Sequence, residues 1–394
     1  MKILFISALL PYPLHSGGAV RVYNLLKRLG VSHEITLATF LRNDKEREYV
    51  SKLPFCKKIE TVMRGHAWQP GYVAKSIFST YPLLFTSYQN KTMKQYIASE
   101  LSANQYDLVH IEPSYVWSAL PRISVPLVVC EHNIEHLGYK GYAQRFSFAP
   151  FRPFLMLDVA KLAWWERKVW QKAARIITVS SEDRDVIAKA VSREKIDVVP
   201  NGVDLKEFVF KPKKPNSSPV FLFVGNFSWL QNRDAAKFLA RDIWPDLRKQ
   251  HPQASLRFVG RGAPSDLRAK IQSGGAQLLD GVDDIRAQHA DADVLIAPIR
   301  LGSGSRYKIL ESMASGVPVI TTRVGAGGLE VESGRDIMLA ETPQDFLLAS
   351  QTLLSNQKLR ISIAKSARKV IEKSYSWEII ARELEAVWER VCGK

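Results

Sequence analysis

Cysteine is scarce in this chain. Among its 394 residues only Cys56, Cys130 and Cys392 carry a thiol. An odd number of cysteines without paired spacing supports neither a disulfide framework nor a zinc site. We therefore expect the protein to work in a reducing compartment, the cytoplasm.

Long hydrophobic runs are also absent. No apolar stretch of the sequence reaches the roughly 18 residues that a membrane-spanning helix requires. The short run Ile3–Leu10 follows a single cation, as in a signal peptide, but Pro11-Tyr12-Pro13 and a glycine-rich loop follow it in place of a cleavage site. We expect a protein that is soluble, or peripheral on the inner face of the plasma membrane.

Acidic residues are outnumbered by basic ones. The chain has 39 Asp and Glu side chains against 55 Lys and Arg, a formal net charge of +16. Such an excess favours anionic partners such as phosphates, nucleic acid or an acidic membrane surface, although a solvated basic surface gives the same balance. The cations are dispersed and the sequence contains no recognised nucleic-acid-binding module, so we expect no nucleic-acid partner.

Short β-branched or apolar runs alternate with longer amphipathic segments from end to end. This alternation is typical of parallel sheets with crossover helices. It predicts an α/β fold with two doubly wound, Rossmann-like domains at residues 1–200 and 201–375, a polar linker at 210–219, and a terminal helix at 376–394 that packs back on the first domain. We expect ligands at the carboxyl ends of the strands and in a cleft between the domains. The predicted strands are Ile3–Ala8, Glu34–Phe40, Lys58–Met63, Leu108–Glu112, Leu127–Glu131, Ile176–Ser180 and Asp197–Val199, followed by Val220–Val224, Ser255–Val259, Ala276–Leu279, Val294–Ile299, Val317–Thr321 and Ile337–Ala340.

A glycine-rich loop after the strand at 294–299 carries the most informative pattern. The loop contains Gly302-Ser303-Gly304-Ser305, continues through Arg306 and Lys308, and opens a helix that holds Glu311. Glycines let a backbone approach a ligand closely, and the free amides at a helix start attract anions. Two cations beside them and a carboxylate that can accept hydrogen bonds from ribose hydroxyls suit a nucleoside diphosphate, although a plain solvated turn can have the same composition.

This segment resembles the donor-binding signature of glycosyltransferase family 4, a group of retaining enzymes with the GT-B fold. Glu311, Met313-Ala314, Gly316 and Pro318 match the second half of that signature. Ser303 stands where the family commonly has a first glutamate. The loop is similar to a sub-branch with the pattern Gly-x-Gly-x-Arg-x-Lys, in which the cations are associated with the diphosphate.

Further matches to the family extend over nearly the whole chain. Asn201-Gly202-Val203-Asp204 resembles the interdomain hinge, and Asn226 follows the first strand of the second domain, where many members have an arginine. The resemblance implies a metal-independent transfer from a nucleoside-diphosphate sugar, without a cofactor. The donor-binding residues that it implies are Gly17, Gly18, Asn226, Gly260, Arg261, Val282, Ser303, Gly304, Ser305, Arg306, Lys308 and Glu311.

The polar residues after the strand at 127–131 are expected to lie at the reacting centre. His132 resembles a family residue that hydrogen-bonds the donor sugar, so the catalytic candidates are His132, Arg306, Lys308 and Glu311. The resemblance implies a front-face reaction, in which the leaving phosphate helps to deprotonate the acceptor. An alternative uses Glu112 or Glu131 as base or nucleophile, and both could instead be structural. The acceptor-side candidates are Arg21, Glu112, Glu131 and Asn133.

Two histidines outside this set have other interpretations. His110 lies within an apolar strand and is interpreted as a core residue. His136 follows His132 by four residues, but no third ligand has metal-site spacing, so no metal is expected.

Aromatic and cationic residues are interleaved between residues 138 and 175. Such a mixture suits an anionic bilayer surface or a lipid-linked acceptor at residues 139–154, and an ordered surface loop is an equal alternative. The run at 164–175 is interpreted as a crossover helix.

The sequence therefore predicts a retaining, hexosyl-type glycosyltransferase. Its acceptor is expected to be a glycan or a lipid-linked sugar, in cell-surface polysaccharide or glycolipid biosynthesis. The alternatives are an epimerase or phosphorylase of the same fold, and a non-catalytic binder of nucleotide sugars.

Overall fold

The chain forms two compact units. The computed structural model describes residues 1–394 except 67, 145, 147, 214–216, 283 and 302–305. The first unit contains Met1–Pro200 and Ile380–Lys394, and the second contains Asn201–Ile379. The chain thus passes from one unit to the other at residue 200 and returns at residue 379.

The first unit contains a seven-stranded parallel sheet in the order β3-β2-β1-β4-β5-β6-β7. Its central strands are mostly apolar because helices cover both faces of the sheet. The order reverses between β1 and β4, the switch point at which such sheets bind ligands. The strands are β1 (Lys2–Ser7), β2 (Glu34–Leu41), β3 (Lys58–Met63), β4 (Leu108–Glu112), β5 (Leu127–Glu131), β6 (Arg175–Thr178) and β7 (Ile196–Val198).

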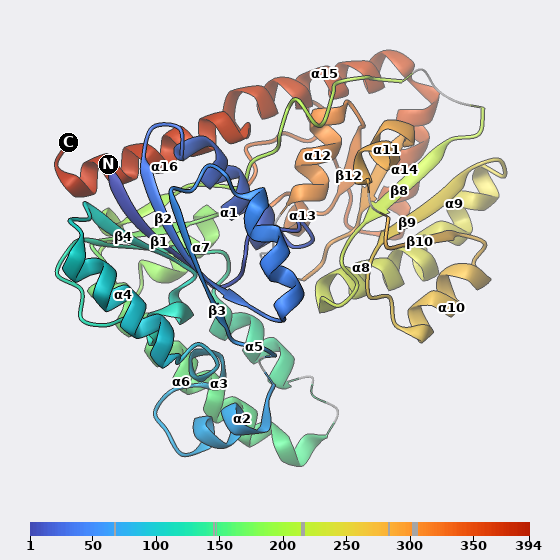
Figure 1. The fold of residues 1–394 in the computed structure, drawn as a ribbon. Coiled ribbons are helices and arrows are strands. Elements are labelled where there is room, and N and C mark those ends of the chain that lie inside the picture. Colours follow the sequence, from blue (N-terminus) through green and yellow to red (C-terminus); the bar gives the residue numbers. More distant parts are fainter. Residues whose placement is uncertain (67, 145, 147, 214–216, 283, 302–305) are drawn as a thin grey trace. The chain divides into compact units, whose positions relative to one another are not determined.

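Helices α1 and α4 lie on opposite faces of this sheet, whereas α2, α3, α5 and α6 gather in a lobe at one end of the unit (Figure 1). Helix α1 begins where the Ser16 hydroxyl accepts from the amide of Ala19, 3.3 Å away. The helices are α1 (Gly17–Leu29), α2 (Pro70–Ile77), α3 (Leu83–Thr86), α4 (Lys91–Ala103), α5 (Glu135–Gln144), α6 (Arg152–Lys172) and α7 (Ser181–Ile187), with 3₁₀ turns η1 (Asp44–Lys52), η2 (Ser114–Ala119), η3 (Ala149–Phe151) and η4 (Arg193–Lys195).

The second unit repeats the design with six parallel strands in the order β10-β9-β8-β11-β12-β13. Its switch point lies between β8 and β11. The strands are β8 (Val220–Val224), β9 (Ser255–Gly260), β10 (Gln277–Asp280), β11 (Val294–Ala297), β12 (Val319–Thr321) and β13 (Met338–Leu339).

Local signals set the helix ends of the second unit. Helix α12 ends at Gly316, whose φ of 81° is left-handed and favours glycine. Helix α14 begins in a capping box between Thr342 and Asp345. The helices are α8 (Leu230–Phe238), α9 (Trp244–Gln250), α10 (Ser265–Ser273), α11 (Ile285–Asp291), α12 (Tyr307–Ser315), α13 (Arg323–Ala326), α14 (Pro343–Ser355) and α15 (Gln357–Ser374), with the π-helical turn η5 (Leu239–Ile243) between α8 and α9.

The last helix, α16 (Trp377–Cys392), contributes most of its length to the first unit. There His33 bonds to Glu385 at 2.7 Å, and Arg390 pairs with Asp197 at 2.9 Å. Trp388 is fully buried against the sheet.

The α/β architecture with two doubly wound sheets is confirmed. The predicted linker is wrong in part, since Lys211 donates from its backbone to the Ser315 carbonyl at 3.0 Å and packs within the second unit. The segment in which aromatic and cationic residues are interleaved contributes most of α5 and all of α6 to the helical lobe of the first unit. Within the described ranges, every helix is too short or too polar to span a bilayer.

Candidate functional site

A buried carboxylate ends β4 at the switch point of the first sheet. Glu112 is fully buried, and its Oε1 accepts from Arg21 Nε at 2.9 Å and from His132 Nε2 at 2.5 Å. Burial opposes ionisation, but the hydrogen bond from His132 and the charge of Arg21 hold the pKa of Glu112 well below its ordinary value. Glu112 is therefore an anion that orients its neighbours.

The second switch-point residue, His132, packs against the start of α1. Its Nε2 faces Glu112, and a Cβ added to Gly18 would lie 3.1 Å from Nδ1. Only glycine at position 18 leaves room for the ring where it stands, since 3.1 Å is tighter than ordinary contact. Because Glu112 is ionised, it accepts the proton of Nε2, and Nδ1 is the ring nitrogen with an acceptor lone pair. Gly17, the other predicted glycine, is the first residue of α1.

Behind Glu112 lies His110, whose tautomer is set from the terminal helix. The Nε1–H of Trp388 donates to His110 Nδ1 at 3.1 Å. An indole nitrogen can only donate, so Nδ1 accepts and Nε2 carries the ring proton. That Nε2 lies 3.4 Å from Glu112 Oε2. Burial lowers the pKa of His110, and the ring is neutral.

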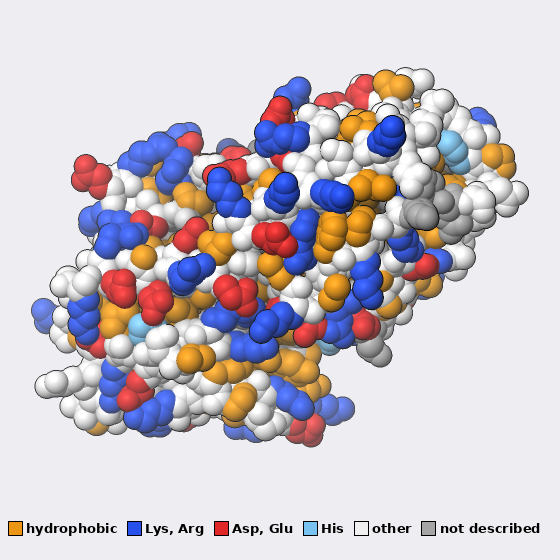
Figure 2. Space-filling model, turned by 90° about the horizontal axis from the view of Figure 1, so that it is seen from above, with side chains coloured by type: hydrophobic (Ala, Val, Ile, Leu, Met, Phe, Trp, Pro, Cys, Tyr) orange, Lys and Arg blue, Asp and Glu red, His pale blue; other side chains and the backbone are white. Residues whose placement is uncertain are grey.

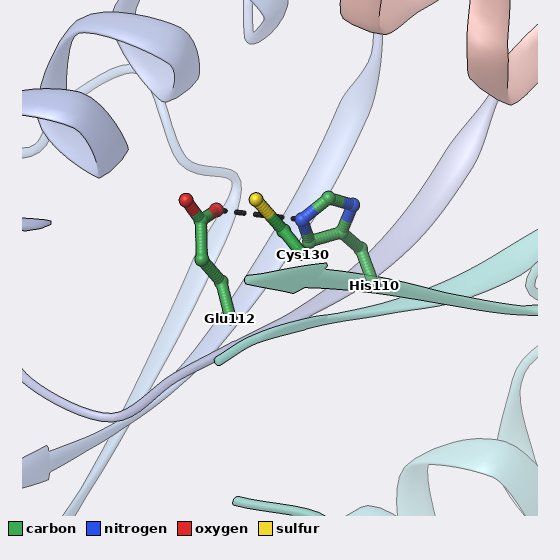
Figure 3. A group of neighbouring side chains, drawn as sticks. All are labelled: His110, Glu112 and Cys130. Atoms are coloured by element: carbon green, nitrogen blue, oxygen red, sulfur yellow. Dashed lines mark ion pairs between the residues drawn. The ribbon is translucent and has the colours of Figure 1, made fainter. Parts of the chain in front are cut away.

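Figure 3 shows His110, Glu112 and Cys130, whose potential ligand atoms all lie within 4.8 Å of one another. The chemistry of the group does not fit a metal ion. Nε2 of His110 carries a proton in place of a lone pair, and burial raises the pKa of the Cys130 thiol well above its ordinary value. Arg21 already balances the charge of Glu112, and His132 donates to the same carboxylate.

The other two acceptor-side candidates differ in their surroundings. Glu131 is fully buried at the end of β5, where it accepts from Trp170 Nε1 at 2.6 Å and from the Ser114 amide at 3.3 Å. Burial, with the charge of Glu166, raises the pKa of Glu131 to about 8. This geometry favours the structural alternative for Glu131. Asn133 is half-buried, two residues beyond the strand.

The second sheet has its own cluster at the switch point between β8 and β11. Lys308, on α12, donates from Nζ to Asn232 Oδ1 at 2.7 Å and lies 4.7 Å from the centre of the Phe223 ring. Asn232 in turn donates to the Asn226 carbonyl at 2.9 Å. Burial, reinforced by the charge of Arg306, lowers the pKa of Lys308 to about 7.

Arg306 is held by carbonyl oxygens. Its Nη2 donates to Val324 at 2.6 Å and its Nε to Gly327 at 3.2 Å, at the end of α13. The guanidinium thereby stabilises the C-terminal end of that short helix while its charge stays beside Lys308.

Glu311 lies one turn further along α12. Its Oε2 is 3.3 Å from Nε2 of His289, a fully buried ring whose Nδ1 lies 3.0 Å from the Ser312 hydroxyl. Only a small part of the Glu311 side chain, 16%, is exposed. Its second carboxylate oxygen can accept from a ligand hydroxyl.

Loops from neighbouring strands pack closely beside this cluster. A Cβ on Gly260 would lie 1.8 Å from the Gly225 carbonyl oxygen, so glycine at 260 is required for the close approach of β8 and β9. The Arg261 carbonyl accepts from the Phe227 amide at 2.8 Å, and Val282 packs against the core. Ser303, Gly304 and Ser305 lie outside the described residues.

The sequence reasoning missed three residues of these clusters as functional candidates. Asn232, His289 and Trp388 were not singled out for function. A buried tryptophan with an N–H group needs an acceptor, and this was the one signal available for Trp388.

Two Rossmann-like sheets, each with polar loops at the switch point of its strand order, define the GT-B class of fold. Comparison with known proteins extends this assignment. The model of Glycosyltransferase Family 4 matches residues 15–207, and that of Glycosyl transferases group 1 matches residues 218–356. The chain is therefore a glycosyltransferase, whose N-terminal half matches the first of these families and whose C-terminal half matches the second.

A related protein sequence and two solved structures are similar to nearly the whole chain. The chain is 25% identical to a phosphatidyl-myo-inositol mannosyltransferase of Mycolicibacterium smegmatis, over 92% of this chain and 90% of that protein. Sucrose-phosphate synthase from Thermosynechococcus elongatus has a similar structure, with a TM-score of 0.75, 18% identity and 100% of both chains covered. Anabaena HepE in complex with UDP and glucose gives a TM-score of 0.65 at 17% identity, over 99% of this chain and 100% of that one.

Proposed function

We propose that this chain is a retaining glycosyltransferase that moves a hexosyl group from a nucleoside-diphosphate sugar to a glycan or lipid-linked acceptor. The second unit binds the donor and the first unit binds the acceptor. No metal ion or cofactor takes part. The observation that carries the proposal is the placement of Lys308, a packed cation at the switch point of the second sheet, beside Arg306 and bonded to Asn232.

An ammonium group with a lowered pKa is poised to receive an anion. Burial removes water from Lys308, its hydrogen-bond partner is the neutral amide of Asn232, and the charge of Glu311 offsets the effects of burial and Arg306 only in part. A diphosphate would supply two or more negative charges there and restore full protonation of Lys308. Arg306 contributes a second positive charge, and Glu311 accepts from the ribose hydroxyls of the nucleoside.

The first unit supplies the groups that face the sugar. The positive N-terminal end of α1, at Gly17 and Gly18, attracts the anionic end of the donor. His132, oriented by Glu112, presents Nδ1 as an acceptor for a sugar hydroxyl.

In the proposed reaction, the bond from the anomeric carbon to the β-phosphate oxygen breaks, and its electron pair leaves with the diphosphate. The acceptor oxygen forms the new bond on the same face of the sugar, and its proton passes to the departing phosphate. Lys308 and Arg306 stabilise the charge that develops on the diphosphate. A covalent intermediate on Glu112 or Glu131 is disfavoured, because Arg21 and His132 hold the first carboxylate and Trp170 caps the second.

The acceptor is inferred from the relatives. The mannosyltransferase that matches most of this chain takes, by its name, an acceptor built on phosphatidyl-myo-inositol. We infer a cytoplasmic role in the biosynthesis of a cell-surface polysaccharide or glycolipid.

A calorimetric screen of nucleoside diphosphates and their sugars, with EDTA present, tests the donor site. The parental chain should bind one nucleoside diphosphate, and turnover with the matching sugar should persist in EDTA. Lys308→Ala and Arg306→Ala should each lose about a hundredfold or more in kcat, comparable to the loss of one electrostatic donor at other active sites. The matched control is Lys358→Ala, an exposed lysine on α15. Parental binding and turnover in both site variants would refute the proposal.

A further inference from the structure

The lobe at the end of the first unit exposes large apolar side chains to an unusual degree. Six of them lie on or directly beside α2, η3 and α6, and each is exposed by 50% to 89%. Every exposed phenylalanine among the described residues belongs to this set. We call this surface the aromatic–basic lobe. It consists of these apolar residues and the exposed cations of the same segments: Ile77, Phe78, Phe148, Phe151, Phe154 and Leu157, with Lys75, Lys140 and Arg152.

Three of these side chains are neighbours along the start of α6. Phe151 and Phe154 are in ring contact, with centroids 5.6 Å apart, and Leu157 follows one turn later on the same face of α6. Exposed apolar residues gathered in this way mark an interaction surface, because a soluble protein rarely leaves them uncovered.

Partly buried polar contacts join α2 to α6. Asp158, on α6, accepts from the Ser76 hydroxyl at 3.1 Å and from the Leu83 amide at 2.9 Å. Lys161 donates to the carbonyls of Ser76 and Ser79, at 2.9 and 2.8 Å. The end of α2, which carries Ile77 and Phe78, is thereby fastened to α6.

The charge around the lobe is of one sign. The sequence has no Asp or Glu between residues 64 and 82, and between residues 137 and 165 it has only Asp158, whose carboxylate is engaged as described. Lys75, Lys140 and Arg152 are exposed in the same segments. On the face drawn in Figure 2, by contrast, carboxylates are interspersed among the cations.

We propose that the aromatic–basic lobe docks on an anionic lipid bilayer. Phenylalanine and leucine side chains enter the boundary between headgroups and acyl chains, and the surrounding cations pair with lipid phosphates. A bilayer fits better than a neutral protein surface, because the lobe combines protruding apolar side chains with cations and without exposed carboxylates. The binding does not depend on donor turnover, so it can fail while the proposed transferase activity stands.

Vesicle cosedimentation of the full chain tests this docking. The chain should bind vesicles of phosphatidylcholine mixed with phosphatidylglycerol and should bind vesicles of phosphatidylcholine alone much more weakly. The triple substitution Phe78→Ser, Phe154→Ser, Leu157→Ser should lower the partition coefficient by about tenfold or more. Lys75→Glu with Lys140→Glu should also lower it by about tenfold or more.

Matched controls separate the lobe from the general charge and hydrophobicity of the chain. The apolar control changes Val31, Val209 and Leu348 to serine, three exposed side chains outside the lobe. The charge control is Lys358→Glu with Lys369→Glu, exposed lysines on α15. Both controls should bind as the parental chain does, and circular dichroism should show every variant folded.

Three results would overturn the proposal: no binding to the anionic vesicles, full binding by both lobe variants, or equal losses in the controls. The last result would mean that dispersed net charge alone attracts the chain. If the lobe binds an acidic protein in place of lipid, the chain will not bind the anionic vesicles.

Discussion

Replacing Trp388 by phenylalanine should impair the reaction from a position that touches no substrate. The indole N–H fixes the tautomer of His110, which places a proton beside Glu112 Oε2, and Glu112 orients His132. Phenylalanine keeps most of the apolar volume but leaves Nδ1 of His110 as a buried acceptor without a donor. Losing that partner costs about 1–3 kcal/mol in the free energy of unfolding, and the smaller ring adds a cavity term of similar size.

The effect on turnover has a separate origin. Without the indole donor, His110 can carry its proton on Nδ1, and the Nε2 lone pair then faces the Glu112 carboxylate. Repulsion between them shifts Glu112, and His132 with it. We expect kcat to fall about tenfold, which corresponds to about 1.4 kcal/mol in the activation barrier, with a smaller change in KM. Nitrogen NMR of the imidazoles should detect the change of tautomer directly.

Trp244→Phe is the matched control. Trp244 is also fully buried, and its Nε1 donates to the Gly274 carbonyl at 3.0 Å, in the second unit. It should lose comparable stability in urea unfolding and keep the parental kcat. Two results would show that Trp388 does not act on His132 through His110 and Glu112. In the first, both variants lose equal stability and equal activity. In the second, Trp388→Phe keeps the parental kcat and imidazole spectrum.

Three further predictions concern single positions. Gly18→Ala should lower kcat without lowering the melting temperature, because its Cβ presses on the His132 ring at 3.1 Å, while Gly71→Ala, at the same position of α2 and with nothing within 4 Å, should leave kcat unchanged. Burial lowers the pKa of Lys308 to about 7 and a bound diphosphate would raise it, so affinity for the nucleoside diphosphate should be constant below about pH 7 and fall above it. Lys308→Arg, always protonated, should show no such fall by calorimetry. Burial, with neighbouring carboxylates, raises the pKa of Glu135 to about 8, so this group destabilises the fold as the pH rises from about 4 through 8. Glu135→Gln should therefore melt higher than the parental chain at about pH 9 and equally at about pH 5, and equal melting at both would refute the shift.

The strands were predictable because helices cover both faces of each sheet. A strand buried on both sides is a mostly apolar run, and the observed bounds of β4 (Leu108–Glu112) and β8 (Val220–Val224) are those expected from such runs. Polar residues directly after these runs could be placed at the carboxyl edges for the same reason. Glu112 and His132 were placed beside the site in this way.

The sequence did not allow us to predict which side chains that are far apart along the chain contact one another. Trp388 and His110 are separated by 278 positions, and both fit an apolar pattern that predicts burial and nothing more. The lowered pKa of Lys308 depends on packing around its ammonium group and on Arg306, which no local spacing encodes. Residue identity predicted which groups are chemically able to act, and only the fold determines their protonation.

The protonation states in the first unit also bear on the choice between the two mechanisms considered from the sequence. A carboxylate nucleophile must be able to leave its partners and approach the anomeric carbon. Glu112 is ionised, which suits a nucleophile, but two of its partners are charged or chargeable and one of them, Arg21, is itself buried. Separating a buried ion pair leaves each charge uncompensated and costs about 3–5 kcal/mol. Glu131 has the opposite defect, since its raised pKa keeps it largely protonated at neutral pH and unable to attack. The two carboxylates are thus poor nucleophiles for different physical reasons, and in the proposed reaction the negative charge available to the acceptor is that of the leaving diphosphate.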